Sequence, residues 1–229
     1  MLIFVNQGLI VYSMPKTGST SIEKAIGKYA SIKLSGTGDN GLKHINSKQF
    51  NKWRRTLRKE FPKRKFVSCC VIREPLDRLK SWYRYKSRDE LKNKKRYVGN
   101  LSFDKYLNNL CDKIEKKSTR YYLNSLSRFL IFKEKINVDR IFPYEKIEQF
   151  TDFLSLKLNK EIKLPRKNVS PKISSSKLQV SEETLNRLNP FISLDVNLYN
   201  KILEIGSYDS SIKEHNKSVR EILNKAGFK

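Results

Sequence analysis

The sequence predicts an α/β fold with a central, mainly parallel sheet flanked by helices, and three observations support that class. First, short apolar runs typical of strands alternate with longer amphipathic stretches typical of helices. Second, two of the strand-like runs end in short polar loops, the position at which α/β sheets bind ligands. Third, neither an internal repeat nor a Pro/Gly/Ser-rich linker interrupts the 229 residues. We therefore expect a single domain over residues 1–229.

The first part of the chain predicts a hairpin, a helix, a loop and a second helix, in that order. The runs "LIFV" and "LIVYS" flank Asn6–Gly8, a spacing that favours a β-hairpin. "STSIEKAIGKYA" predicts a helix with one apolar stripe, formed by Ile22, Ala25, Ile26 and Tyr29. The Gly-rich stretch "SGTGDNGLK" predicts a loop, and "SKQFNKWRRTLRKEF" predicts a basic amphipathic helix.

The rest of the chain continues the alternation. "KFVSCCVI" favours a strand buried on both faces. It is followed by a helix with Pro75 in its first turn, in which we expect Leu76, Leu79 and Trp82 to lie in the core. We expect the Lys-rich residues 90–135 to be helical. "NVDRIFPYEKI" predicts a short strand, "EQFTDFLSLKL" a helix and "PRKNVSPK" a loop, before helices over residues 181–205.

Composition and charge narrow the classes of partner. The chain has 48 Lys and Arg against 23 Asp and Glu, a formal net charge of +25. Such a charge favours a nucleic acid, an anionic glycan or a multiply phosphorylated nucleotide as partner. The 38% hydrophobic content excludes a disordered chain. Because the sequence has no run of 18 apolar residues and no signal-peptide pattern, we expect a cytoplasmic protein without an integral membrane segment.

Cysteine and histidine are too scarce for a structural metal site or a disulfide framework. The three cysteines include no Cys-x-x-Cys pair, and we expect buried thiols, with Cys69 and Cys70 on opposite faces of a strand. The two histidines are His44 and His215, and we expect His215 to be solvated within its polar surroundings.

The first polar loop, "PKTGSTS", predicts an anion site at a helix N-terminus. Its small residues allow a phosphate to approach the backbone N–H groups, which lack intrahelical acceptors in the first turn of a helix. Hydroxyl groups add donors, and Lys16 at the mouth of the loop reaches a bridging oxygen of the bound group. The candidate residues are Pro15, Lys16, Thr17, Gly18, Ser19, Thr20 and Ser21.

The second loop, "REPLDRLKSWY", predicts a second anion site. Arg73 stands at a strand end, and Ser81 follows about two helical turns into the next helix. A guanidinium can bind a phosphate through two hydrogen bonds, and the hydroxyl can donate to the same group. Arg78, one turn before Ser81, is a candidate to assist.

Together the two loops resemble those of the sulfotransferase superfamily that uses 3′-phosphoadenosine 5′-phosphosulfate. "PKTGSTS" is similar to its 5′-phosphosulfate loop, and "REPLDRLKSWY" to its 3′-phosphate segment in the form common in the carbohydrate branch. The later segments "FPYEKIEQF", "LPRKNVSP" and "LDVNLYNKI" also resemble family segments, so the resemblance spans about residues 8–205.

The resemblance implies a P-loop-like, three-layer fold and a role for each motif. Residues 17–21 would hold the 5′-phosphosulfate, and Lys16 would stabilise charge on the bridging oxygen. Arg73 and Ser81 would bind the 3′-phosphate, and Arg166 with Lys167 would close over the nucleotide. No Walker-type Gly-Lys-Ser/Thr is present, which fits a transfer that requires no metal.

The acceptor hydroxyl requires a general base, and His44 is the first candidate, with Glu145 and Asp39 as alternatives. We expect the acceptor to be a glycan, anionic or neutral, and no nucleic acid. The basic helix over residues 52–65 could bind an anionic polysaccharide or a membrane surface, or be a solvated face. The oligomeric state cannot be deduced from the sequence.

Two other functions compete with a sulfotransferase. A nucleotide-dependent kinase with an atypical P-loop would turn over ATP with Mg²⁺. A nucleic-acid-binding protein would use the +25 charge and show strongly salt-dependent binding, although its aromatic-rich binding motifs are missing.

Overall fold

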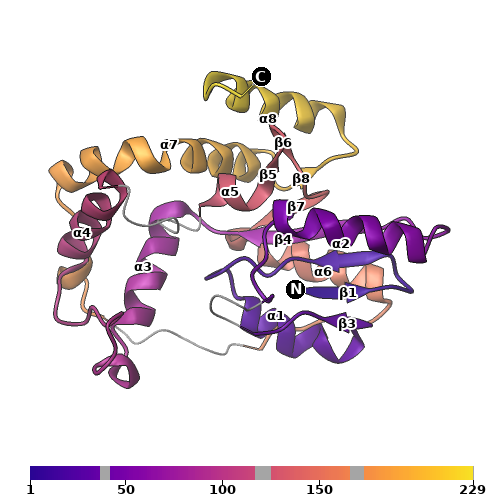
Figure 1. Ribbon diagram of the computed structural model, residues 1–229, viewed down its shortest axis with the longest axis horizontal. Coiled ribbons are helices and arrows are strands. Elements are labelled where there is room, and N and C mark those ends of the chain that lie inside the picture. Colours follow the sequence, from indigo (N-terminus) through magenta and orange to yellow (C-terminus); the bar gives the residue numbers. More distant parts are fainter. Residues whose placement is uncertain (37–41, 117–124, 166–172, 229) are drawn as a thin grey trace.

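Parallel strands form the middle of a six-stranded sheet in the computed structural model, which describes residues 1–36, 42–116, 125–165 and 173–228 (Figure 1). The strand order is β3–β1–β2–β4–β7–β8. The bounds are β1 Leu2–Phe4, β2 Leu9–Val11, β3 Ile32–Lys33, β4 Val67–Ile72, β7 Arg140–Pro143 and β8 Tyr208–Asp209. The pairs β2–β4 and β4–β7 are parallel, whereas the outer pairs are antiparallel. The predicted parallel sheet is thus confirmed for its centre.

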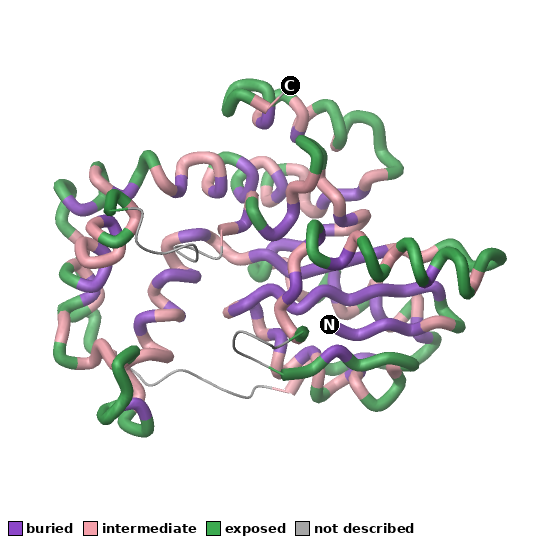
Figure 2. The backbone as a smooth tube through the Cα atoms, in the orientation of Figure 1, coloured by how far each residue is buried: buried purple, intermediate pink, exposed green. Residues whose placement is uncertain are grey.

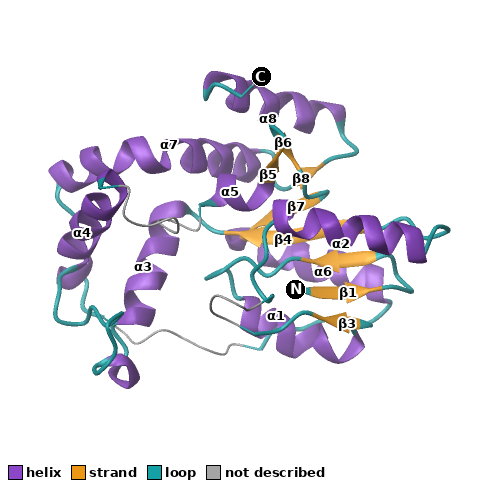
Figure 3. Cartoon of the chain, in the orientation of Figure 1, coloured by secondary structure: helices purple, strands orange, loops and turns teal. Residues whose placement is uncertain are grey.

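Helices cover both faces of this sheet (Figure 3). One face packs against α1 (Ser19–Ile26) and α6 (Ile147–Leu158). The other packs against α2, α5, α7 and α8. Their bounds are α2 Ser47–Glu60, α5 Leu126–Leu130, α7 Glu182–Glu204 and α8 Lys213–Lys225. This helix–sheet–helix arrangement confirms the three-layer prediction.

Strand β4 shows why the sheet needs cover on both faces. Its side chains alternate, so that Cys69 and Val71 join one apolar cluster while Cys70 and Ile72 join the other. Both cysteines are fully buried, and burial raises the pKa of each thiol. The prediction of two buried thiols on opposite faces is confirmed.

A third apolar cluster lies beyond the carboxyl ends of the parallel strands. It joins α3 (Pro75–Lys86), α4 (Phe103–Glu115) and the first half of α7, at the left of Figure 1. Figure 2 shows the buried stretches of these helices turned toward one another. Tyr83 packs against Phe103 and Tyr106, with ring centres 5.4 and 5.6 Å away. The edge of the sheet that holds the two polar loops therefore faces the helices α3, α4 and α7.

Residues 90–135 are only partly helical, contrary to prediction. The region starts with a 3-10 turn (η2, Asp89–Leu91). The next helix, α4, begins only after its N-cap Ser102, whose hydroxyl accepts a hydrogen bond from Lys105 N. The Lys-rich stretch between them repels itself and lacks the apolar spacing of a helix. The region ends in a β-hairpin of β5 (Ile131–Phe132) and β6 (Lys135–Ile136).

The last part of the chain is helical over residues 182–204, as predicted, but it contains two further elements. Residues 182–204 form one helix with Pro190 inside it, and β8 and α8 follow where no element was predicted. His215 is half-buried on α8: its Nδ1 accepts a hydrogen bond from Asp209 N, and its ring packs on Tyr208. The prediction of a solvated histidine was therefore wrong. The other 3-10 turns are η1 Gly27–Tyr29, η3 Tyr144–Lys146 and η4 Ser176–Leu178.

Two further observations concern single side chains and hydropathy. Tyr29, placed by prediction on the apolar stripe of α1, is exposed on η1, and Lys160 lies 5.1 Å from its ring centre. Over the described ranges, every helix is either too short or too polar to cross a bilayer.

Candidate active site

The first polar loop connects the end of β2 to the start of α1 and contains two left-handed residues. Lys16 has φ 68° and Gly18 has φ 76°. Gly18 tolerates this conformation because it has no Cβ, whereas Lys16 adopts it at a cost in backbone strain. Thr17 is buried between them, and its hydroxyl donates to the Met14 carbonyl over 2.9 Å. The Thr17 hydroxyl is therefore engaged in a hydrogen bond within the loop.

Gly18 is the N-cap of α1, and it leaves the start of the helix without a side-chain cap. Glycine offers no side-chain cap, and no carboxylate lies in the first turn. The backbone N–H groups of Ser19 and Thr20 consequently receive no capping acceptor, while the helix dipole favours negative charge at this end. Ser19 is buried and Thr20 half-buried. A tetrahedral anion fits this helix start.

The second loop connects β4 to α3. Glu74 caps α3, and its carboxylate accepts from Leu76 N and Asp77 N over 2.9 and 2.5 Å. Arg73 precedes it with a side chain only 18% exposed. Its Nε donates to Asp77 Oδ2 over 2.5 Å, which fixes the guanidinium at the strand end. Ser81 follows on α3 and is buried.

The two loops are in direct contact at the carboxyl edge of the sheet. Arg73 NH1 donates to the Lys16 carbonyl over 3.3 Å, although the two residues are 57 positions apart. Tyr144, at the end of β7, lies against both: its ring centre is 4.9 Å from the Arg73 guanidinium carbon, and a Cβ on Gly18 would lie 3.5 Å from its ring. The two polar loops, predicted to lie at one edge of the sheet, are therefore neighbours in the fold.

The Lys16 side chain lies against two aromatic rings of α3. Its Nζ is 4.4 Å from the centre of the Tyr85 ring and 5.3 Å from that of Trp82. Burial, followed by the like charges of Arg88 and Arg73, lowers the pKa of Lys16 to about 8. The loop thus holds an ammonium that is partly shielded from water and surrounded by other cations.

His44 lies beside the same loop. Its Nδ1 is 2.6 Å from the Ser13 carbonyl, three residues before Lys16. Because a carbonyl oxygen only accepts, Nδ1 carries the proton, and Nε2 of the neutral ring holds a lone pair. Burial is the main cause that lowers the pKa of His44, and it favours the neutral form of the ring. The preceding residue, Lys43, forms an ion pair of 2.7 Å with Glu23 of α1, which ties this segment to the helix.

Two side chains near the second loop differ from prediction. Arg78 is not available to a ligand, because it is 1% exposed and pairs with Asp195 of α7 over 3.7 Å. It points from α3 into the molecule and joins α3 to α7. Trp82 was expected in the core with Leu76 and Leu79, but it is half-buried and contacts Lys16. The sequence pattern could not separate these cases, because the two residues are four positions apart and project from a similar side of α3.

Of the alternative general bases and the residues expected to close over the nucleotide, the structure describes only Glu145. The carboxylate of Glu145 accepts a hydrogen bond from the Tyr199 hydroxyl of α7, and this contact raises the pKa of the tyrosine, after burial. Glu145 therefore links η3 to α7. Asp39, Arg166 and Lys167 lie outside the described residues. Within the described ranges, no group of three or more His, Cys, Asp or Glu side chains could hold a metal.

Asp77, Tyr144 and Tyr85 are site residues that sequence reasoning missed. Asp77 is four positions after Arg73, a spacing that predicts an ion pair once a helix begins at Pro75. Tyr144 stands in the segment "FPYEKIEQF" at a predicted strand end, but its contact with Arg73 joins two elements far apart in sequence.

Comparison with known proteins agrees with this geometry. The sequence profile of the Sulfotransferase family matches residues 1–201, a region that contains both polar loops and His44. Neither a curated protein nor a solved structure gives a match. Since the matched region covers most of the 229 residues, the chain belongs to the sulfotransferase family.

Proposed function

We propose that the protein transfers a sulfuryl group from 3′-phosphoadenosine 5′-phosphosulfate to a hydroxyl group of a carbohydrate. Family membership supports sulfotransfer in general. The donor has one anionic group at each end of its ribose, and the observation that best supports it is the hydrogen bond between Arg73 and the Lys16 carbonyl. That contact brings two separate anion-binding loops to one edge of the sheet.

In this proposal the first loop binds the 5′ end of the donor. The N–H groups of residues 17–21 surround the phosphosulfate at the uncapped start of α1, with Pro15 shaping the loop. Lys16 lies at the loop and supplies positive charge to the bridging oxygen as the sulfur–oxygen bond breaks. To do so its Nζ leaves the ring of Tyr85 and turns to the ligand.

The second loop binds the 3′ end. Arg73 donates to the 3′-phosphate while Asp77 holds its guanidinium in place. Ser81 adds a hydroxyl donor from α3. Arg166 and Lys167 keep their proposed role in closing over the nucleotide, a role that rests on the family resemblance alone.

His44 is the proposed general base. Nε2 accepts the proton of the acceptor hydroxyl, whose oxygen then forms the new bond to sulfur. The bond between sulfur and the bridging oxygen breaks, and the electron pair remains on the nucleotide, which leaves as 3′,5′-adenosine bisphosphate. The hydrogen bond from Nδ1 to the Ser13 carbonyl fixes the required tautomer.

The acceptor class and the location are inferred from the composition of the sequence. The net charge of +25 favours an anionic glycan over a small neutral alcohol. The absence of a metal requirement and a cytoplasmic location remain proposals from the sequence.

A thermal-shift titration tests the donor class. We expect 3′,5′-adenosine bisphosphate to raise the melting temperature without Mg²⁺, because a ligand that binds only the folded state stabilises it. ATP, with and without Mg²⁺, should have a smaller effect. Stabilisation by Mg²⁺-ATP alone would instead support a kinase, and transfer of ³⁵S from labelled donor to a panel of glycans would identify the acceptor.

A further inference from the structure

A surface pocket lies between α2 and the β5–β6 hairpin, away from the two polar loops of the candidate active site. Its volume is about 380 Å³, within the range of small-ligand sites. Three cations line it: Arg55 from α2 and Lys133 and Lys135 from the hairpin. Phe132 and Ile136 contribute apolar surface, and Asn51 and Asn137 contribute side-chain amides. We name it the α2–hairpin pocket.

The three cations of this pocket outnumber the one carboxylate of the hairpin turn, that of Glu134, which stands between Lys133 and Lys135. All three cations are exposed, and none forms an ion pair with a carboxylate of the described residues. Like charges that converge on one hollow repel each other unless an anion binds between them. The pocket therefore presents net positive charge next to amide groups and an apolar wall.

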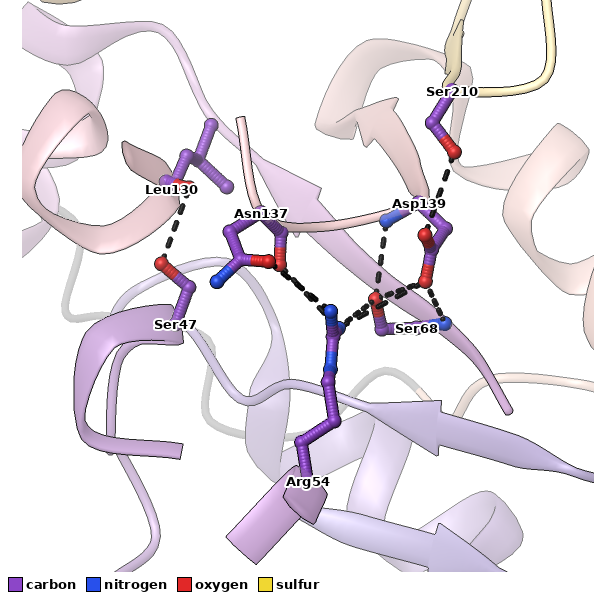
Figure 4. Close-up of polar contacts among 7 residues, drawn as sticks. All are labelled: Ser47, Arg54, Ser68, Leu130, Asn137, Asp139 and Ser210. Carbon is purple, nitrogen blue, oxygen red and sulfur yellow. Dashed lines mark hydrogen bonds and ion pairs between the residues drawn. The ribbon is translucent and has the colours of Figure 1, made fainter. Parts of the chain in front are cut away.

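Hydrogen bonds on the inner side of α2 fix one wall of the pocket (Figure 4). Arg54, next to Arg55, donates to the Asn137 side-chain oxygen over 3.1 Å and to Ser68 Oγ over 2.9 Å. Ser68 in turn donates to Asp139 over 2.6 Å. At the start of α2, Ser47 Oγ donates to the Leu130 carbonyl over 3.1 Å. These contacts hold α2 and the chain around the hairpin at a fixed separation.

The turn of the hairpin has a strained backbone. Lys133 and Glu134 have φ angles of 50° and 59°, a left-handed conformation that favours Gly or Asn. Arg220 of α8 donates to the Glu134 carbonyl over 3.0 Å and so supports the turn from outside. A lysine at this position costs stability compared with asparagine, and it supplies a cation to the pocket.

The pocket lies along the helix that follows His44. The N-cap Asn46 is two residues after His44, and Arg55 is nine residues further, about 13 Å along the helix axis. An acceptor chain that places one hydroxyl at His44 can therefore reach the pocket with another of its units. This step rests on the proposed function, because it takes His44 as the acceptor end of the site.

The lining favours a glycan over other polyanions. Amide groups can exchange hydrogen bonds with sugar hydroxyls, and the three cations suit sulfate or carboxylate groups. Single-stranded nucleic acids bind on several stacked aromatic rings, whereas Phe132 is the one aromatic residue that lines this pocket. We infer that the α2–hairpin pocket binds an anionic unit of a polymeric glycan, the acceptor whose reacting unit lies at His44.

A charge-neutralising triple variant tests this inference. Arg55→Gln, Lys133→Asn and Lys135→Gln remove the three cations, and Asn suits the left-handed turn. The matched control is Lys24→Gln, Lys28→Gln and Lys160→Gln, which removes the same charge from exposed positions on the other face of the sheet, beside α1 and α6. Binding of a heparin octasaccharide, a sulfated probe, is measured by calorimetry at about 0.15 M salt. Arg55→Gln alone serves as a second variant that leaves the hairpin unchanged.

We expect the pocket variant to lose about tenfold or more in affinity for the octasaccharide and the control less than about threefold. Equal losses would show that general charge, not the pocket, binds the probe, and would overturn the inference. Tighter binding of single-stranded RNA that the same three substitutions abolish would also overturn it. Stabilisation by 3′,5′-adenosine bisphosphate is measured in each variant, so that failure of the donor site is recognised separately from failure of the pocket.

Discussion

The ammonium nitrogen of Lys16 lies 4.4 Å from the centre of the Tyr85 ring. The contact favours the charged form, whereas burial of the side chain disfavours it. Burial, followed by the like charges of Arg88 and Arg73, lowers the pKa of Lys16 to about 8. A lysine in the proposed catalytic position therefore begins to lose its charge only slightly above neutral pH.

We expect a bell-shaped dependence of kcat/KM on pH. The rising limb reports His44, whose lowered pKa places it below the usual 6.5, because the base acts only when neutral. The falling limb reports Lys16, at about 8, because the lysine acts only when charged. Initial rates at low substrate concentration from pH 5 to 10 measure both limbs.

Arg88→Gln should move the alkaline limb of this profile upward, because it removes the like charge that, after burial, lowers the pKa of Lys16. Arg84→Gln, on the adjacent helix α3, is the matched control and should leave the limb in place. An alkaline limb that stays unchanged in Arg88→Gln would assign it to another group.

Lys16→Ala should lower kcat by about 10²–10³, the usual effect of removing one group that stabilises transition-state charge. Affinity for 3′,5′-adenosine bisphosphate should change little, since the product lacks the sulfuryl group. Single-turnover transfer of ³⁵S and calorimetry with the bisphosphate separate the two effects. An equal loss in both would place Lys16 in donor binding instead.

Arg73→Ala should weaken the affinity for 3′,5′-adenosine bisphosphate about 10–100-fold, because a hydrogen bond to a charged group contributes about 1.5–3 kcal/mol. Calorimetric titration measures the change. Arg84→Ala removes an equal charge from α3 and serves as control. Unchanged binding in Arg73→Ala would disprove the assignment of the 3′-phosphate site.

His44→Asn is designed to keep the anchor of the ring and remove the base. The asparagine Nδ2 can donate to the Ser13 carbonyl as His44 Nδ1 does, but nothing replaces Nε2. We expect kcat/KM to fall about 10²–10⁴ with an unchanged melting temperature. His215→Asn is the control, and full activity in His44→Asn would direct attention to Asp39 or Glu145.

The buried pair of Arg78 and Asp195 predicts a stability effect without a direct effect on the site. Asp195 also accepts from Leu126 N, Ser127 N and Ser127 Oγ. Asp195→Leu should therefore destabilise the protein by about 3–5 kcal/mol, because it removes the carboxylate that faces the buried Arg78 guanidinium and takes the acceptor from the Leu126 and Ser127 N–H groups. Arg78→Met should cost less, because the carboxylate keeps its three donors. Urea unfolding monitored by circular dichroism measures both, and equal costs would contradict this ranking.

Local patterns were sufficient to predict the elements that hold the site. The β1–β2 hairpin, the two-sided burial of β4 and the start of α3 at Pro75 all follow from neighbouring residues. The two loops could be placed at one edge because parallel strands end on the same side of a sheet. The hydrogen bond from Arg73 to the Lys16 carbonyl agrees with that placement.

Contacts between distant segments could not be predicted. The two-residue strand β8 is defined only by its pairing with β7. The turn of the β5–β6 hairpin has the sequence Lys-Glu, whereas Asn-Gly is the pair that would have predicted such a turn. Arg78 and Trp82 have neighbouring positions on α3, yet one points into the molecule and the other toward Lys16. The difference in their burial depends on α7, whose Asp195 pairs with Arg78.

Strand β8 has a consequence for biosynthesis. It pairs with β7 through Ile141 and Tyr208, and Asp209 forms an ion pair of 2.7 Å with Arg140. Until the ribosome has released residues 208–209, the hydrogen-bonding edge of β7 is unpaired, and such edges recruit other strands. A chain truncated at residue 201 would contain the whole family region and both donor loops but leave that edge open, so we expect it to aggregate where the full chain folds.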